Sequence, residues 1–139
     1  MIQFFFEDVE NNIQPSYADW LQELIIGEEK KLGKVNYILC DDDYLLKINQ
    51  DFLQHDYYTD IITFDKVKGK TINADIFVSL QRVNDNANLM QKSTDEELRR
   101  VLAHGLLHLV GYKDKSDEEQ KEMRSKEDFY LALFAEKYI

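Results

Sequence analysis

The most informative segment of the chain runs from His104 to Asp114 and reads HGLLHLVGYKD. His104 and His108 are four residues apart, so on a helix their side chains lie one turn apart on the same face and can bind one metal ion. Gly111 follows where a helix can end in a left-handed residue, and after the turn Asp114 can return as a third ligand. Three protein ligands leave one coordination position open, as in catalytic zinc sites, whereas structural zinc has four protein ligands. The segment therefore predicts one zinc ion per chain, held by a helix and the turn that follows it.

The alternative interpretation is that the two histidines are hydrogen-bonded core residues, which is the commoner case for a histidine pair taken alone. Gly111 and Asp114 weaken it, because they stand in register with the extended zincin pattern H-x-x-x-H-x-x-G-x-x-H, with aspartate in the last place. The chain's remaining histidine, His55, is expected to be an exposed loop residue. Imidazole and carboxylate ligands suit nickel as well as zinc, so the pattern does not separate the two metals.

A three-ligand zinc site favours hydrolysis as the reaction class. Zincin proteases have a glutamate directly after the first histidine, where it acts as general base. This chain has Gly105 at that position, which argues against peptide hydrolysis and leaves the general base unidentified.

Composition restricts the class of protein further. The chain has 139 residues, of which 44% are hydrophobic, so residues 1–139 are expected to form one domain with a real core. The single cysteine, Cys40, cannot form an internal disulfide, and the first residues contain neither a basic stretch nor a long apolar run. These features favour a cytoplasmic protein without a signal peptide or membrane span.

The net charge of −10 argues against a general nucleic-acid coat protein, because phosphate binding needs concentrated positive charge. It still permits a local basic groove. The candidates for such a groove are Lys66, Lys68 and Lys70, Arg99 and Arg100 before the histidines, and Lys113 and Lys115 after them. The alternative for each is a solvated surface residue.

Hydrophobic periodicity and turn residues predict eight helices and strands. The predicted strands cover residues 2–6, 35–40, 60–64 and 74–80, and the predicted helices cover 15–32, 41–52, 93–110 and 116–138. Gly33 is expected to stop the first helix. Ser93 with Glu96 fits a capping box at the start of the helix that carries the two histidines, and this helix is apolar nearly all round, so it should be buried. We expect the first two strands to be parallel, because a helix connects them, and the last two to form an antiparallel hairpin. The prediction is an α+β fold with a mixed four-stranded sheet, covering helices, and the metal site on a buried central helix and the following turn.

The chain resembles the YbeY family, bacterial ribosomal-RNA maturation factors described as metal-dependent endoribonucleases. Three blocks carry the resemblance. Residues 104–114 match the family motif H-G-x-L-H-L-x-G-Y-D-H at seven positions, residues 59–64 resemble P-T-D-V-L-S-F, and residues 74–76 resemble G-D-I. Asn49 to Phe52 resembles the N-x-x-Y/F entry to the second of these blocks. Order and spacing agree from Asn49 to Asp114.

The resemblance implies a mixed four-stranded sheet, a metal in a cleft and single-stranded RNA as substrate. It also implies maturation of the 3′ end of ribosomal RNA in the small ribosomal subunit and a part in ribosome quality control, with neither DNA nor membrane as partner. His104, His108 and Asp114 would be the catalytic metal ligands. Asp60 could orient a ligand or a water molecule, and the alternative is that Thr59 and Asp60 only cap the turn into a strand.

The chain departs from the family at four positions. Asp114 replaces the third histidine, Lys113 replaces the aspartate before it, and Tyr58 replaces a proline. Leu53 replaces an arginine that is thought to bind RNA phosphate, a role that Arg99, Arg100 or Lys66 could take over. Two rival functions remain open: a ribosome-assembly binding factor whose metal is structural, and a metal-dependent hydrolase of another bond.

Overall fold

The computed structural model describes residues 1–10 and 13–138. Its centre is a four-stranded sheet in the order β1-β2-β4-β3. The strands are β1 (Ile2–Phe6), β2 (Lys31–Cys40), β3 (Ile61–Asp65) and β4 (Thr71–Ser79). β1 and β4 both run parallel to β2, whereas β3 pairs antiparallel with β4. The predicted mixed sheet, with a parallel first pair and an antiparallel hairpin, is confirmed.

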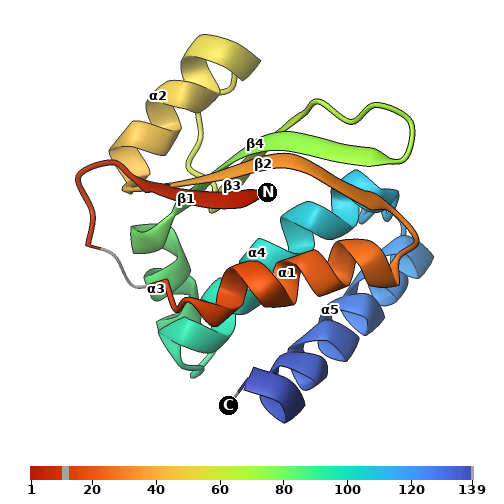
Figure 1. The fold of residues 1–139 in the computed structure, drawn as a ribbon. Helices are drawn as coiled ribbons and strands as arrows, with labels where there is room; N and C mark the ends of the chain where they lie inside the picture. The colour runs from red at the N-terminus through yellow and green to blue at the C-terminus, as the bar shows by residue number, and fades with distance from the viewer. Residues whose placement is uncertain (11–12, 139) are drawn as a thin grey trace.

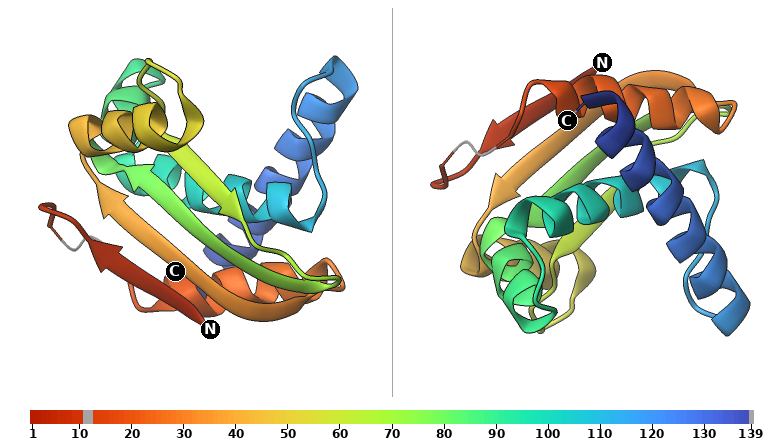
Figure 2. Two further views of the ribbon diagram at one scale, coloured as in Figure 1. Left: turned by 90° about the horizontal axis from the view of Figure 1, so that it is seen from above. Right: turned by 90° about the horizontal axis from the view of Figure 1, so that it is seen from below.

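The helices cover the two faces of the sheet unequally (Figure 1). They are α1 (Ser16–Gly27), α2 (Asp42–Leu53), α3 (Leu80–Leu89), α4 (Thr94–Val110) and α5 (Asp117–Tyr138). α1 and α4 pack on one face, and α5 packs across these two helices, whereas α2 lies on the opposite face (Figure 2). None of the helices in the described part of the chain is long and apolar enough to cross a membrane.

α4 is the central helix of the core, as its apolar sequence predicted. Leu98, Leu102 and Leu106 are buried against the sheet, and the backbone carbonyl of Leu102 accepts a hydrogen bond of 2.7 Å from the Tyr37 hydroxyl on β2. Ser93 caps the helix by accepting from the backbone N–H of Glu96, which is one of the two bonds of the predicted capping box. His104 and His108 are therefore carried by a helix that is fixed along most of its length.

Two predictions about the elements were wrong. α1 ends at Gly27 rather than at residue 32, and Gly33 does not stop a helix but lies within β2, at an irregularity between Leu32 and Val35. A Cβ atom at Gly33 would lie 2.2 Å from Asn73 Oδ1, so the Asn73 side chain, which accepts a hydrogen bond from the Lys34 backbone N–H, would have to move. The sequence analysis also missed α3, because its segment LQRVNDNANL contains three asparagines, which favour helices weakly. Its buried Val83 and Ala87 and the Ser79 cap stabilise it.

Candidate metal centre

His104 and His108 lie one turn apart on α4, and the helix ends directly beyond them. Gly111 has φ 122°, a conformation that favours glycine. Its N–H donates to the carbonyl of His108, and the N–H of Tyr112 donates to the carbonyl of Leu107, so the last turn is closed. The chain then reverses, which brings Asp114 back to the two histidines.

The three predicted ligands converge on one point. His104 Nε2 lies 3.4 Å from Asp114 Oδ2, and His108 Nε2 lies 3.3 Å from the same oxygen. One donor atom from each residue lies within 4.8 Å of the other two. Tetrahedral zinc, with bonds of about 2.0–2.1 Å, places its ligand atoms about 3.3 Å apart. Charge-assisted hydrogen bonds are shorter, about 2.7–2.9 Å. The spacing therefore fits donors arranged around a cation, and this cluster could hold a metal ion.

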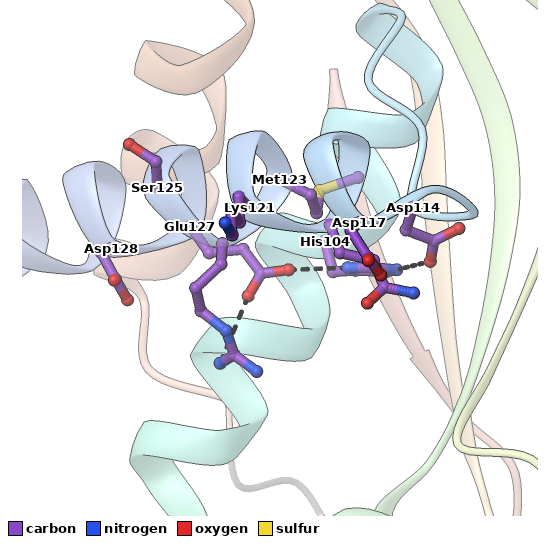
Figure 3. A pocket seen from close by; sticks show the side chains of 10 residues that line it. His104, Asp114, Asp117, Lys121, Met123, Ser125, Glu127 and Asp128 are labelled. Carbon is purple, nitrogen blue, oxygen red and sulfur yellow. Dashed lines mark hydrogen bonds and ion pairs between the residues drawn. The ribbon is translucent and has the colours of Figure 1, made fainter.

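The orientation of His104 is set by Glu127 on α5. Its Nδ1 atom lies 2.7 Å from Glu127 Oε2, while its Nε2 faces Asp114 (Figure 3). When Nδ1 carries the proton and donates it to Glu127, the Nε2 lone pair is directed at the cluster. Burial disfavours the charged imidazole, but the hydrogen bond and charge of Glu127, with the charges of Asp114 and Asp60, raise the pKa of His104 overall.

Glu127 is itself held by Arg100. The Nη1 atom of Arg100 donates to Glu127 Oε1 at 2.8 Å, and its Nη2 atom donates to Asp128 at 2.8 Å. Burial alone would raise the pKa of Glu127, but the hydrogen bonds from His104 and Arg100 lower it below its ordinary value. Glu127 is thus a buried carboxylate that stays ionised and can stabilise a proton on His104 Nδ1.

Glu127 was not among the predicted site residues, although the sequence contains a signal for it. The inward face of α5 consists of Met123, Glu127, Tyr130 and Phe134, which follow helical spacing. A lone carboxylate in such an apolar row needs a buried partner. Its partners lie 23 and 27 residues earlier in the chain.

The remaining candidate residues differ in how close they lie to the cluster of His104, His108 and Asp114. Arg100 is connected to the cluster by Glu127, which binds both Arg100 and His104. Asp60 lies close enough for the charge of His104 to lower its pKa, although burial, the larger effect, raises it overall. The hydroxyl of Thr59 donates to the carbonyl of Ile61 at 3.5 Å, a local turn contact. Arg99 stacks over the Phe134 ring at 4.7 Å, and Lys66 pairs with Asp75 at 2.6 Å in a separate hollow.

A hollow of about 780 Å³ opens beside the cluster. His104 and Asp114 line it from α4 and the turn, and Asp117 and Lys121 line it from α5 (Figure 3). Arg124 of α5 lines it as well. A substrate in this hollow would therefore lie against His104 and Asp114 and against α5 side chains of both signs, because Glu127 and Asp128 line it as well.

Gly105 faces away from this hollow. It is buried, and a Cβ atom there would lie 2.9 Å from Ile61 Cδ1, with Ile76 behind it. The position that carries the general base in zincin proteases therefore points into the sheet. The geometry agrees with the sequence in arguing against that protease mechanism.

Comparison with known proteins gives a consistent result over nearly the whole chain. The family model described as "Endoribonuclease YbeY" matches residues 3–135. The endoribonuclease YbeY of Flavobacterium johnsoniae is 53% identical over 135 residues, which cover 96% of this chain and 97% of the relative. That of Cytophaga hutchinsonii is 52% identical over 136 residues, covering 95% and 94%. The solution structure of TM1509 from Thermotoga maritima superposes with a TM-score of 0.73 at 30% identity, over 98% of this chain and 91% of that one.

Proposed function

The chain belongs to the YbeY family and is an endoribonuclease, and from this premise we propose that it is a zinc enzyme of ribosomal RNA maturation. In this proposal it acts in the cytoplasm on single-stranded RNA at the 3′ end of the small-subunit ribosomal RNA, and it serves in ribosome quality control. The one observation that carries the proposal is the convergence of His104, His108 and Asp114 beside an open hollow. Each of the three side chains is only partly buried, as a site that admits substrate requires.

The donor set fits zinc, because two imidazoles and one carboxylate leave an open coordination position. When bound, the metal ion would supply Lewis acidity toward a phosphodiester oxygen and lower the pKa of water. Glu127 accepts a hydrogen bond from His104 Nδ1–H and keeps the ring in one orientation. Lys121 and Arg124 line the hollow next to His104 and would offer positive charge to the phosphates of the substrate.

The decisive experiment measures the metal content of the purified protein by mass spectrometry, in wild type, His108→Ala and Asp114→Ala. We expect about one zinc per chain in wild type, as a one-site cluster requires, and little or none in the two variants. His55→Ala is the matched control, because its ring lies in an exposed loop and stacks on Tyr57. Absence of metal in the wild type after zinc reconstitution would contradict the proposal.

A second candidate function is ribosome assembly by binding alone, with a structural metal. The net charge of −10 and the uncharged Leu53 at the end of α2 favour it. It predicts that folded His108→Ala still restores ribosomal RNA maturation in cells lacking the wild-type protein. The enzyme proposal predicts that this variant binds ribosomal particles but neither restores maturation nor cleaves RNA.

A further inference from the structure

A half-buried carboxylate, Glu28, connects three parts of the molecule behind the candidate metal centre. Glu28 directly follows α1, and its side chain is largely buried. It accepts hydrogen bonds from the hydroxyls of Tyr112 at 2.6 Å and Tyr130 at 2.5 Å, and from Lys126 Nζ at 3.2 Å. Lys126 also lies over the Tyr112 ring, 5.5 Å from its centre. We call these four residues the Glu28 cluster.

Tyr112 links the Glu28 cluster to the candidate metal centre, because it lies in the turn that carries the third candidate ligand, Asp114. The turn begins at Gly111, and Asp114 follows Tyr112 by two residues in a segment without helix or strand. The backbone N–H of Tyr112 is bound to the end of α4, and its hydroxyl is bound to Glu28. The position of the Asp114 carboxylate therefore depends on a segment that the Tyr112 side chain ties to α1 and α5.

We propose that Glu28 is a positioning residue, which holds the Tyr112 turn so that Asp114 lies against His104 and His108 before a metal ion binds. This inference rests on the proposed metal function of the three ligands. A turn that is fixed in advance loses little conformational freedom on metal binding, whereas a free turn must be ordered at that moment, and the affinity falls accordingly.

The molecule contains an internal control for this proposal at Glu23. Glu23 lies on α1 and accepts hydrogen bonds from Lys137 Nζ at 2.5 Å and from the Tyr138 hydroxyl at 2.8 Å, both on α5. The chemistry is similar to that of the Glu28 cluster, with one glutamate of α1 or its end, one lysine and a tyrosine hydroxyl, but Glu23 has one tyrosine partner where Glu28 has two. Neither Lys137 nor Tyr138 belongs to the turn that carries Asp114.

The test compares Tyr112→Phe with Tyr138→Phe. Each substitution removes one tyrosine hydroxyl that donates a hydrogen bond to a glutamate, Glu28 in the first case and Glu23 in the second. The zinc dissociation constant is measured by competition with a chromogenic chelator, and the visible absorption spectrum is recorded with Co²⁺ in place of zinc. We expect Tyr112→Phe to weaken zinc binding by about 10-fold, as substitutions behind metal ligands commonly do, and to change the Co²⁺ spectrum. Tyr138→Phe should leave both unchanged, even if it lowers the melting temperature as much.

Wild-type zinc affinity and an unchanged Co²⁺ spectrum in folded Tyr112→Phe would overturn the inference, and so would equal losses of affinity in both variants. If Tyr112→Phe does not fold, the same two measurements are made on Glu28→Gln and, as its control, Glu23→Gln. Only Glu28→Gln is then expected to weaken zinc binding and change the Co²⁺ spectrum. If the wild-type protein binds neither Zn²⁺ nor Co²⁺, the proposed function fails together with this inference. If the wild type binds both ions and Tyr112→Phe binds them equally well, only the positioning role of Glu28 fails.

Discussion

Two buried carboxylate–arginine pairs lie on different sides of the molecule and share nearly the same chemistry. Glu127 is 4% exposed and accepts from Arg100 at 2.8 Å, whereas Asp42 is 7% exposed and accepts from Arg82 at 2.7 Å. In each pair the second carboxylate oxygen accepts a further hydrogen bond. For Glu127 that oxygen faces His104 Nδ1, and for Asp42 it faces the hydroxyl of Ser79.

The difference between the pairs lies in what this further partner does. Ser79 ends β4 and caps α3 by accepting from the backbone N–H of Arg82, so the Asp42 pair joins α2, β4 and α3. His104 instead presents its other nitrogen to Asp114. The same buried ion pair is therefore an architectural contact on one side and the support of a candidate ligand on the other, and the third partner decides which.

The strongest test of this difference compares Glu127→Gln with Asp42→Asn. Both substitutions remove the negative charge opposite an arginine and keep the shape of the side chain, so both should destabilise the fold. Only Glu127→Gln should also weaken zinc binding, by about 10–100-fold, because the ring of His104 loses its ionised partner. Zinc dissociation constants from chelator competition, measured beside urea unfolding curves, separate the two effects. Equal zinc affinities in the two variants would remove the distinction between the pairs.

Acid unfolding tests the ionised state of Glu127. Its pKa is lowered in the fold because the hydrogen bonds from His104 and Arg100 outweigh burial. A lowered pKa adds stability above the unfolded value of about 4.5, and this stability is lost as the pH falls through the folded pKa. We expect Glu127→Gln to lose less free energy of unfolding than wild type between about pH 5 and pH 3. The exposed Glu122→Gln controls for net charge, and a wild-type slope in Glu127→Gln would contradict the expectation.

The elements set by short-range sequence signals were predictable. α4 follows from its N-cap and apolar run, and the convergence of His104, His108 and Asp114 follows from a spacing of four residues and a glycine turn. The mixed sheet follows from the helix between the first two strands and the short turn between the last two. In all these cases the residues that determine the structure lie within one element or in consecutive elements of the chain.

The parts that were not predictable depend on contacts between distant segments. α3 is a weak helix by composition and is stabilised by packing of Val83 and Ala87 against its neighbours. Gly33 permits the close approach of Asn73, 40 residues away in the chain. Glu127 becomes a partner of His104 only once α5 has packed on α4. Its signal, a carboxylate in an apolar row, indicates that a partner exists without saying which residue it is.

Glu97 extends the comparison to a buried carboxylate without an arginine partner. It is 6% exposed, its Oε1 atom has no hydrogen-bond partner, and burial raises its pKa. A raised pKa favours the fold below the unfolded value of about 4.5, and that contribution is lost as the pH rises through the folded pKa. We therefore expect Glu97→Gln to be about 1 kcal/mol more stable than wild type near pH 7, with the gain disappearing in acid. Urea unfolding near pH 7 and at about pH 4 measures the difference, with the exposed Glu118→Gln as the control. A Glu97→Gln variant that is less stable than wild type near pH 7 would contradict the expectation and mean that the Glu97 carboxylate has a partner.

The smallest expected effect tests whether the α2 side contributes to RNA binding in addition to architecture. Leu53 is the last residue of α2 and is 40% exposed, at the position where the family is expected to have an arginine that binds RNA phosphate. Leu53→Arg should tighten binding of single-stranded RNA a few-fold and steepen the dependence of log affinity on log salt by about 0.7, the value for one phosphate contact. The matched control is Leu89→Arg, because Leu89 is the last residue of α3, is 83% exposed and gains the same charge. Equal changes in both variants would mean that an added charge attracts RNA wherever it stands, and α2 would then have only the architectural role that the Asp42 pair gives it.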